Sequence, residues 1–132
     1  MNIIINIDVP ELDRAVRFYT QALGLIHTRT LDDDTAELTG ASATIYLLCK
    51  GAGTGAVKSP PIPRDYQRHW TPVHFDLVVP DVDEAAARAL AAGAKSETGH
   101  IDWRGSRCLS FSDPFGHGFC FIQFERDGTY LS

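Results

Sequence analysis

Alternating apolar and polar residues open the chain and give way to a helical pattern. Between residues 3 and 9 every odd-numbered position is Ile or Val, whereas Asn6 and Asp8 lie at even-numbered ones. This period of two predicts a strand with one buried face, which the following proline ends. From Leu12 to Leu23 apolar residues recur at spacings of three and four, which predicts an amphipathic helix that ends at Gly24.

Three short strands are expected after this helix, at residues 25–30, 35–38 and 43–50. About seventy positions later the order recurs, with a strand, an Ala-rich helix and three strands expected at residues 73–79, 82–92, 95–100, 106–112 and 118–125. Both copies leave the first strand through a Val-Pro-acid pattern, in which Val9, Pro10 and Asp13 match Val79, Pro80 and Asp83. Two copies of so long a pattern indicate a duplicated module. We therefore predict an α+β fold in a single domain, residues 1–130, with two repeated βαβββ modules at residues 2–50 and 73–126.

Residues 51–72 form a linker between the modules and follow neither pattern. The first half is rich in Gly and Pro, which is typical of a flexible connection. The second half contains Tyr66 and Trp70 and is too aromatic for a simple tether. Residues 64–72 are therefore expected to cover a binding surface, either on the same chain or on a partner subunit, and the sequence leaves both alternatives open.

Composition and charge narrow the classes of partner. The formal net charge is -5, and Lys and Arg form no continuous stripe, which argues against nucleic acid and anionic membranes as partners. No apolar run approaches the length of a membrane span, and no cationic segment precedes the first apolar run, so a secretory signal is not expected. Three cysteines, Cys49, Cys108 and Cys120, are an odd number without metal-site spacing, which favours a reduced, cytoplasmic protein.

Several local features combine with the repeat into a family resemblance. The turn 113–116 reads Asp-Pro-Phe-Gly and precedes the last strand, which carries Gln123. Further features are the pairs Phe18-Tyr19 and Leu23-Gly24, and Arg107 six residues before the turn. With the duplicated module, the chain resembles the vicinal oxygen chelate superfamily, which includes glyoxalase I, extradiol dioxygenases and bleomycin resistance proteins. The resemblance covers about residues 2–125 and implies that each module forms half of a curled mixed sheet, a cup with ligand inside.

The same resemblance implies where a metal would bind. Metal-dependent members hold one divalent ion with four side chains from the first and last strands of each module. These positions correspond here to Ile4, Tyr46, His74 and Cys120. Ile4 has no donor atom, and His74 alone matches a family ligand, so we expect no metal cofactor. The alternative is a zinc site of His74 and Cys120, with or without Tyr46, because three ligands can suffice for catalytic zinc.

Polar residues of the second module are candidates for ligand binding or chemistry. His74 and Asp76 lie on one strand face and suit either an acid/base or hydrogen-bonding pair that orients ligand, or a satisfied buried polar pair. Asn6 occupies the position equivalent to Asp76, which favours a ligand-binding cluster. Cys120 is either a nucleophile with His74 as its base, or a small buried apolar residue.

Aromatic residues outside the helices supply possible walls for a ligand. Tyr66, Trp70 and Trp103 suit a flat or amphipathic ligand, or alternatively a dimer interface or hairpin packing. Arg104 lies beside Trp103 and suits an anionic group, although exposed loop arginines are commonly only solvated.

Two functions are compatible with these observations. The first is a metal-free small-molecule binding protein of the bleomycin-resistance type, with the ligand contacted by Asn6, Tyr46, Trp70, His74, Asp76, Trp103 and Cys120. The second is a glyoxalase-like lyase, isomerase or dioxygenase that uses His74, with or without a divalent metal. A homodimer is expected in either case, because many members of the superfamily form one.

Overall fold

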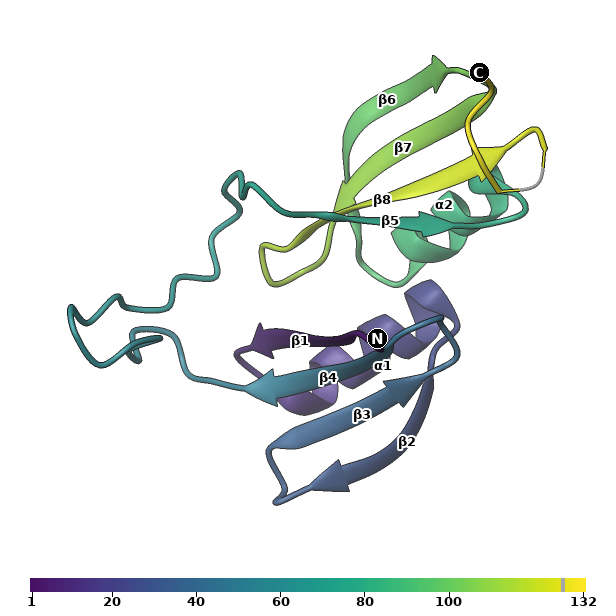
Figure 1. Cartoon of the computed structure of the whole chain (residues 1–132). Coiled ribbons are helices and arrows are strands. Elements are labelled where there is room, and N and C mark those ends of the chain that lie inside the picture. Colours follow the sequence, from purple (N-terminus) through teal and green to yellow (C-terminus); the bar gives the residue numbers. More distant parts are fainter. Residues whose placement is uncertain (127) are drawn as a thin grey trace. The chain divides into compact units, whose positions relative to one another are not determined.

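The computed structural model describes residues 1–126 and 128–132, which divide into two compact units, Met1–Gln67 and Arg68–Ser132 (Figure 1). Each unit contains one helix and one four-stranded mixed sheet. The α+β class and the repeated βαβββ order predicted from the sequence are therefore confirmed. None of the helices in the described residues has the length and apolar character needed to span a bilayer.

The first unit follows the predicted order of elements. It consists of β1 (Ile4–Val9), α1 (Leu12–Leu23), β2 (Ile26–Leu31), β3 (Thr35–Thr39) and β4 (Thr44–Cys49). The strands lie in the order β1-β4-β3-β2, with β1 parallel to β4 and the other pairs antiparallel.

Period-two alternation separates the two faces of this sheet. Apolar residues at alternate positions of β1, β3 and β4 are buried, and α1 contacts β3 and β4. The helix contributes buried Ala15 and Phe18 and ends at Gly24, whose φ of 68° favours glycine. The polar residues between the buried ones therefore lie on the opposite face of the sheet.

Residues 51–64 carry more internal structure than their composition suggests. Backbone hydrogen bonds join Gly53 N–H to the Arg64 carbonyl and Ala56 N–H to the Ile62 carbonyl, at 2.8 and 2.9 Å. The Arg64 guanidinium also bonds the Asp8 carboxylate on β1 at 2.7 Å. This segment is therefore a hairpin-like loop fastened to the first sheet.

The second unit repeats the arrangement with different lengths. It consists of β5 (Phe75–Val78), α2 (Val82–Ala91), β6 (Lys95–Trp103), β7 (Ser106–Ser112) and β8 (Gly118–Phe124), in the order β5-β8-β7-β6. β5 is parallel to β8, and β6 extends further than the predicted 95–100. The extension is possible because Arg104 and Gly105 both have positive φ, and so make a tight hairpin turn.

Aromatic side chains form the core between this sheet and α2. Phe111, Phe119 and Phe121 are buried, with ring centroids 5.4–5.9 Å apart. The buried face of α2 is mainly alanine, and small side chains allow a helix to approach a sheet closely. The Asp81 side chain caps the helix by accepting hydrogen bonds from the N–H groups of Asp83 and Glu84.

The predicted Asp-Pro-Phe-Gly turn connects β7 to β8. One carboxylate oxygen of Asp113 accepts hydrogen bonds from the N–H groups of Phe115 and His117, at 2.8 and 2.9 Å. The φ of Gly116 is 89°, as expected for this position. Asp113 and Phe115 are both buried, so the turn is anchored in the core rather than solvated.

Candidate functional site

A row of polar side chains crosses the open face of the first sheet. Strand register aligns Asn6 with Tyr46, Tyr46 with Glu37, and Glu37 with Arg29, one residue from each strand. The predicted candidates Asn6 and Tyr46 therefore lie side by side. Ile4 pairs with Thr44 one step along the same face, where it supplies no donor atom.

Glu37 holds this row together. One of its carboxylate oxygens accepts hydrogen bonds from the Tyr46 hydroxyl at 2.7 Å and from the Arg29 guanidinium at 3.0 and 3.2 Å, and the other accepts from Thr28 at 2.8 Å. The Tyr46 hydrogen bond, followed by those from Arg29 and Thr28, lowers the pKa of Glu37 to about 2. The same contact with Glu37 raises the pKa of Tyr46. Sequence reasoning missed Glu37, although its place between buried Ala36 and Leu38 indicated a polar face.

A second row crosses the open face of the second sheet. Register aligns Asp76 with Cys120, Cys120 with Ser110, and Ser110 with Thr98. The Ser110 hydroxyl and the Cys120 sulfur are 3.2 Å apart. This row corresponds to that of the first sheet, with Asp76 in the place of Asn6 and Cys120 in the place of Tyr46.

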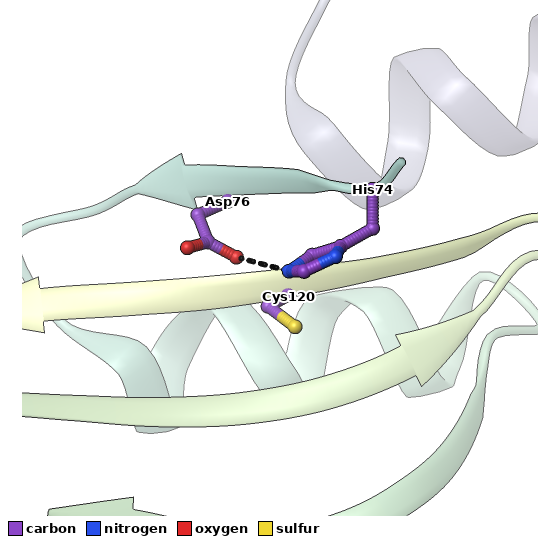
Figure 2. Close-up of side chains that lie close together, drawn as sticks. All are labelled: His74, Asp76 and Cys120. Atoms are coloured by element: carbon purple, nitrogen blue, oxygen red, sulfur yellow. Dashed lines mark ion pairs between the residues drawn. The ribbon is translucent and has the colours of Figure 1, made fainter. Parts of the chain in front are cut away.

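His74 extends this second row into a three-residue cluster. Its ring reaches over β8 beside Asp76, with 3.4 Å between the imidazole Nε2 and a carboxylate oxygen (Figure 2). One ligand atom from each of His74, Asp76 and Cys120 lies within 4.8 Å of the others. The side chains of His74 and Asp76 are 58% and 38% exposed, so the alternative of a buried structural pair does not apply.

Cys108 lies close to Cys120 on the neighbouring strand. Burial, the charge of an ionised Cys120 and a hydrogen bond with Cys120 raise the pKa of the Cys108 thiol to about 12. At neutral pH Cys108 is therefore a protonated thiol that neighbours Cys120.

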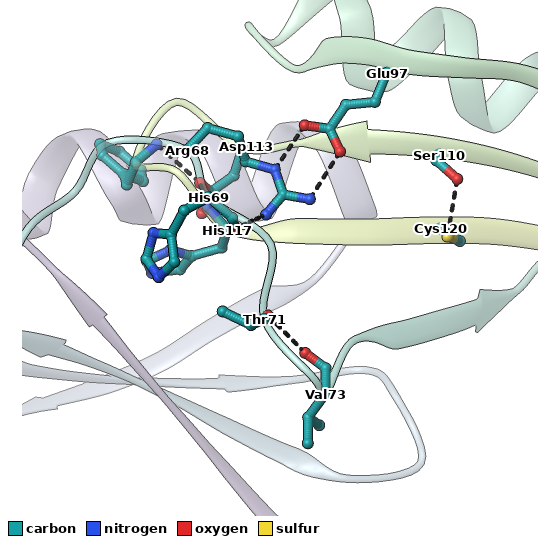
Figure 3. A network of polar contacts seen from close by, with 10 residues as sticks. Arg68, His69, Thr71, Val73, Glu97, Ser110, Asp113, His117 and Cys120 are labelled. Carbon is teal, nitrogen blue, oxygen red and sulfur yellow. Dashed lines mark hydrogen bonds and ion pairs between the residues drawn. The ribbon is translucent and has the colours of Figure 1, made fainter.

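Arg68 is a further polar residue of this face that sequence reasoning missed. Its guanidinium bonds both oxygens of Glu97, at 2.6 and 2.8 Å, and also the backbone carbonyl of His69 (Figure 3). The bond with Arg68 lowers the pKa of Glu97. A methyl group added at Gly118 would overlap the guanidinium, so Arg68 lies over a residue two positions from Cys120.

The predicted aromatic contacts are dispersed. Tyr66 belongs to the first unit and donates its hydroxyl proton to the Lys50 carbonyl at 2.6 Å. Trp70 is 80% exposed and lies in the second unit. Trp103 packs edge-on against Tyr130 with 4.9 Å between centroids, and Arg104 lies over the Trp103 ring.

Trp103 and Arg104 also line a cavity of about 420 Å³ at the β6–β7 hairpin. Trp103 pairs with Ser106, whereas Thr98 of the polar row pairs with Ser110. The cavity therefore lies several residues along the strands from the His74 cluster.

Two residues that contribute to the family resemblance, Gln123 and Arg107, hold elements of the second unit together. The Gln123 side-chain oxygen accepts a hydrogen bond from Val82 N–H at the start of α2, at 2.9 Å. Arg107 bonds Asp83 at 2.9 Å and His100 at 2.7 Å. Gln123 thus joins β8 to the start of α2, and Arg107 joins β7 to α2 and to β6.

The donor atoms test whether the family's four-ligand metal centre fits this chain. Ile4 offers none, and the Tyr46 hydroxyl is already hydrogen-bonded to Glu37. Within the described residues, His74, Asp76 and Cys120 form a group with three possible ligands, all from the second unit. The residues present therefore do not reproduce the family ligand set.

Comparisons with known proteins agree with this architecture of paired βαβββ modules. The chain matches the model of the glyoxalase-like domain over residues 4–122. It therefore belongs to the glyoxalase-like domain family, within the vicinal oxygen chelate superfamily. No curated protein matches the sequence.

Solved structures show the same fold at low sequence identity. A lactoylglutathione lyase from Agrobacterium tumefaciens is 23% identical, with a TM-score of 0.65 and coverage of 93% of this chain and 92% of that one. The fosfomycin resistance protein FosX from Listeria monocytogenes is 16% identical, with a TM-score of 0.71 and coverage of 97% and 96%. A glyoxalase/bleomycin resistance protein/dioxygenase from Nocardioides is 18% identical, with a TM-score of 0.66 and coverage of 100% and 89%.

Proposed function

We propose that this protein binds a small molecule on the open polar face of its second sheet, without a metal and without breaking a bond in the ligand. The observation that carries the proposal is the cluster of exposed His74 and Asp76 with the more buried Cys120, on a sheet whose other face is the hydrophobic core. A small number of convergent polar groups orients the ligand in typical binding sites. The ligand contacts proposed for the first sheet, Asn6 and Tyr46, form a separate polar row.

A thermal-shift screen of small molecules tests this proposal. A ligand at a hundred times its Kd stabilises the folded protein by about 2.7 kcal/mol, which raises Tm by several degrees for a domain of this size. We expect the shift to be lost in His74→Ala and kept in His27→Ala, a matched control on β2. Equal shifts in the wild type and in His74→Ala would place the binding site elsewhere.

Metal content is tested separately from ligand binding. We expect purified protein that is incubated with Zn, Ni, Mn or Fe(II) and desalted to retain much less than one ion per chain in elemental analysis by mass spectrometry. Near-stoichiometric metal that His74→Ala abolishes would refute the metal-free proposal.

An enzyme is the second candidate, because His74 and Asp76 form an acid/base pair beside an exposed surface. Glyoxalase-like lyase, isomerase or dioxygenase chemistry at His74 predicts turnover that His74→Ala abolishes while ligand binding persists. A pure binding protein loses only affinity in the same variant, so parallel turnover and binding assays separate the two functions.

We also propose a homodimer in the cytoplasm. Each unit exposes large apolar side chains, such as Ile26 in the first and Ile101 in the second, which supports association, and the three cysteines are free thiols. Light scattering at micromolar concentration is expected to give twice the mass of one chain. A single-chain mass would refute the dimer.

A further inference from the structure

We propose that Cys120 is a nucleophile that captures an electrophilic small molecule by adding to its activated alkene, with His74 as the base and Asp76 as the residue that positions His74. The inference rests on the binding site of the proposed function and assigns a chemical class to its ligand. It departs from that function in one respect, because the captured ligand loses an alkene π bond and gains a covalent bond to sulfur.

Backbone pairing places the three groups together. Asp76 and Cys120 are register partners on the parallel strands β5 and β8, so their side chains leave the same face of adjacent strands. His74 precedes Asp76 by two residues and lies on the same side, with its ring beside the carboxylate and close to the Cys120 side chain (Figure 2). The mutual distance of 4.8 Å or less leaves each pair within reach of a hydrogen bond after a small side-chain rotation.

Possible hydrogen-bond donors surround the Cys120 sulfur. The Ser110 hydroxyl lies 3.2 Å away and can donate to an ionised sulfur (Figure 3). Cys108 contributes a second donor, since its burial raises the pKa of its thiol. A nearby imidazole and donors to the sulfur are the surroundings that activate cysteine.

Cys49 offers a control within the same chain. Its thiol donates to the Pro10 carbonyl at 3.8 Å, a contact that requires the protonated form. Both cysteines have intermediate exposure as residues, and Cys120 is buried within its cluster, so accessibility does not favour Cys120 over Cys49. A difference in reactivity between them therefore reports their chemical surroundings.

The reaction balances without a cofactor. His74 removes the proton from Cys120 Sγ, and the sulfur electron pair forms a carbon–sulfur bond with the β-carbon of an α,β-unsaturated carbonyl compound. The π electrons of the alkene move to the α-carbon, which takes the proton back from His74. The net step adds S–H across the double bond, with no leaving group and no change in the total number of electrons.

N-ethylmaleimide, an activated alkene, tests the proposal on the full-length protein. Limited labelling at pH 7, digestion and mass spectrometry measure the rate at each cysteine. We expect Cys120 to react about tenfold faster than Cys49, because Cys120 has a neighbouring base, His74, within 4.8 Å. Equal rates at the two cysteines would overturn the proposal.

Variants separate the role of His74 from simple exposure. His74→Gln is expected to slow labelling of Cys120 by roughly tenfold, below the hundredfold or more that is typical of general bases in enzymes, and to leave Cys49 unchanged. Asp76→Asn should slow Cys120 by a smaller factor, and the control His27→Gln should slow neither cysteine. An unchanged Cys120 rate in His74→Gln would refute the assignment of the base.

The two proposals fail in different experiments. Labelling by N-ethylmaleimide does not require the natural ligand, so a failed thermal-shift screen leaves the reactivity result standing. Conversely, a ligand that binds reversibly while Cys120 reacts no faster than Cys49 would retain the proposed function and reject covalent capture.

Discussion

Replacing Asp113 with Ala should destabilise the second unit strongly, because its carboxylate organises the turn before β8. The residue is 2% exposed and accepts two hydrogen bonds from backbone N–H groups, at 2.8 and 2.9 Å. Hydrogen bonds to charged groups contribute about 1.5–3 kcal/mol each, and a buried donor left unpaired costs about 1–3 kcal/mol. Two such losses that partly overlap give an expected decrease of about 3 kcal/mol in the free energy of unfolding.

Urea denaturation monitored by circular dichroism measures this decrease. With an m-value of about 1.5 kcal/mol/M, a loss of about 3 kcal/mol lowers the midpoint by about 2 M. Asp113→Asn is the matched control, since its amide oxygen can accept both hydrogen bonds, and about 1 kcal/mol or less should be lost. A loss below about 0.5 kcal/mol in Asp113→Ala would refute the view that these hydrogen bonds hold the turn.

The turn also sets the register of β8, which carries Cys120. Backbone hydrogen bonding between Asp113 and His117 closes the loop immediately before Gly118, the first residue of the strand. Under conditions in which Asp113→Ala remains folded, we therefore expect slower labelling of Cys120 by N-ethylmaleimide. Unchanged labelling together with a large loss of stability would show that the cluster is positioned by β5 and β7 alone.

Further predictions concern the core, pH and the loop of the first unit. Phe115→Ala should cost about 3–5 kcal/mol in urea denaturation, because the side chain is fully buried. Glu37 stabilises the first unit above its unfolded pKa and loses this contribution as pH falls towards about 2. Thermal melts of Glu37→Gln should therefore show lower stability at pH 7 and a weaker dependence between pH 4.5 and 2, and a curve parallel to the wild type would refute this. Arg64→Ala should release residues 51–64 and speed their proteolysis severalfold relative to Lys58→Ala, since Arg64 bonds Asp8 at 2.7 Å.

The sequence predicted the parts of the fold that depend on local patterns. Both helices, the duplicated order and the Asp113 turn follow from periodicity and turn chemistry, which act over a few neighbouring residues. The same alternation placed Asn6 and Asp8 on a polar face. The juxtaposition of His74, Asp76 and Cys120 was anticipated because His74 and Asp76 share a face of the strand predicted at residues 73–79, and the resemblance supplied Cys120.

Contacts that depend on register could not be predicted in this way. Glu37 meets Tyr46 because β3 and β4 pair at these residues, and alternation alone gives the face of a strand but not its partner. Glu97 reaches Arg68 from a part of β6 where the pairing with β7 shifts between Ser96 and Thr98. Such a bulge redirects a side chain without a clear signal in the hydrophobic pattern.

The two polar rows have different consequences for the mutational sensitivity of the protein. In the first, Tyr46, Arg29 and Thr28 direct their donors to a single carboxylate, so the row already has internal partners. In the second, the carboxylate and imidazole remain open to solvent beside a thiol. The two modules thus carry equivalent polar rows, of which the first is hydrogen-bonded internally and the second is open to solvent and ligand. We therefore expect substitutions in the first row to change the stability of the protein. Substitutions in the second row should change ligand affinity or cysteine reactivity.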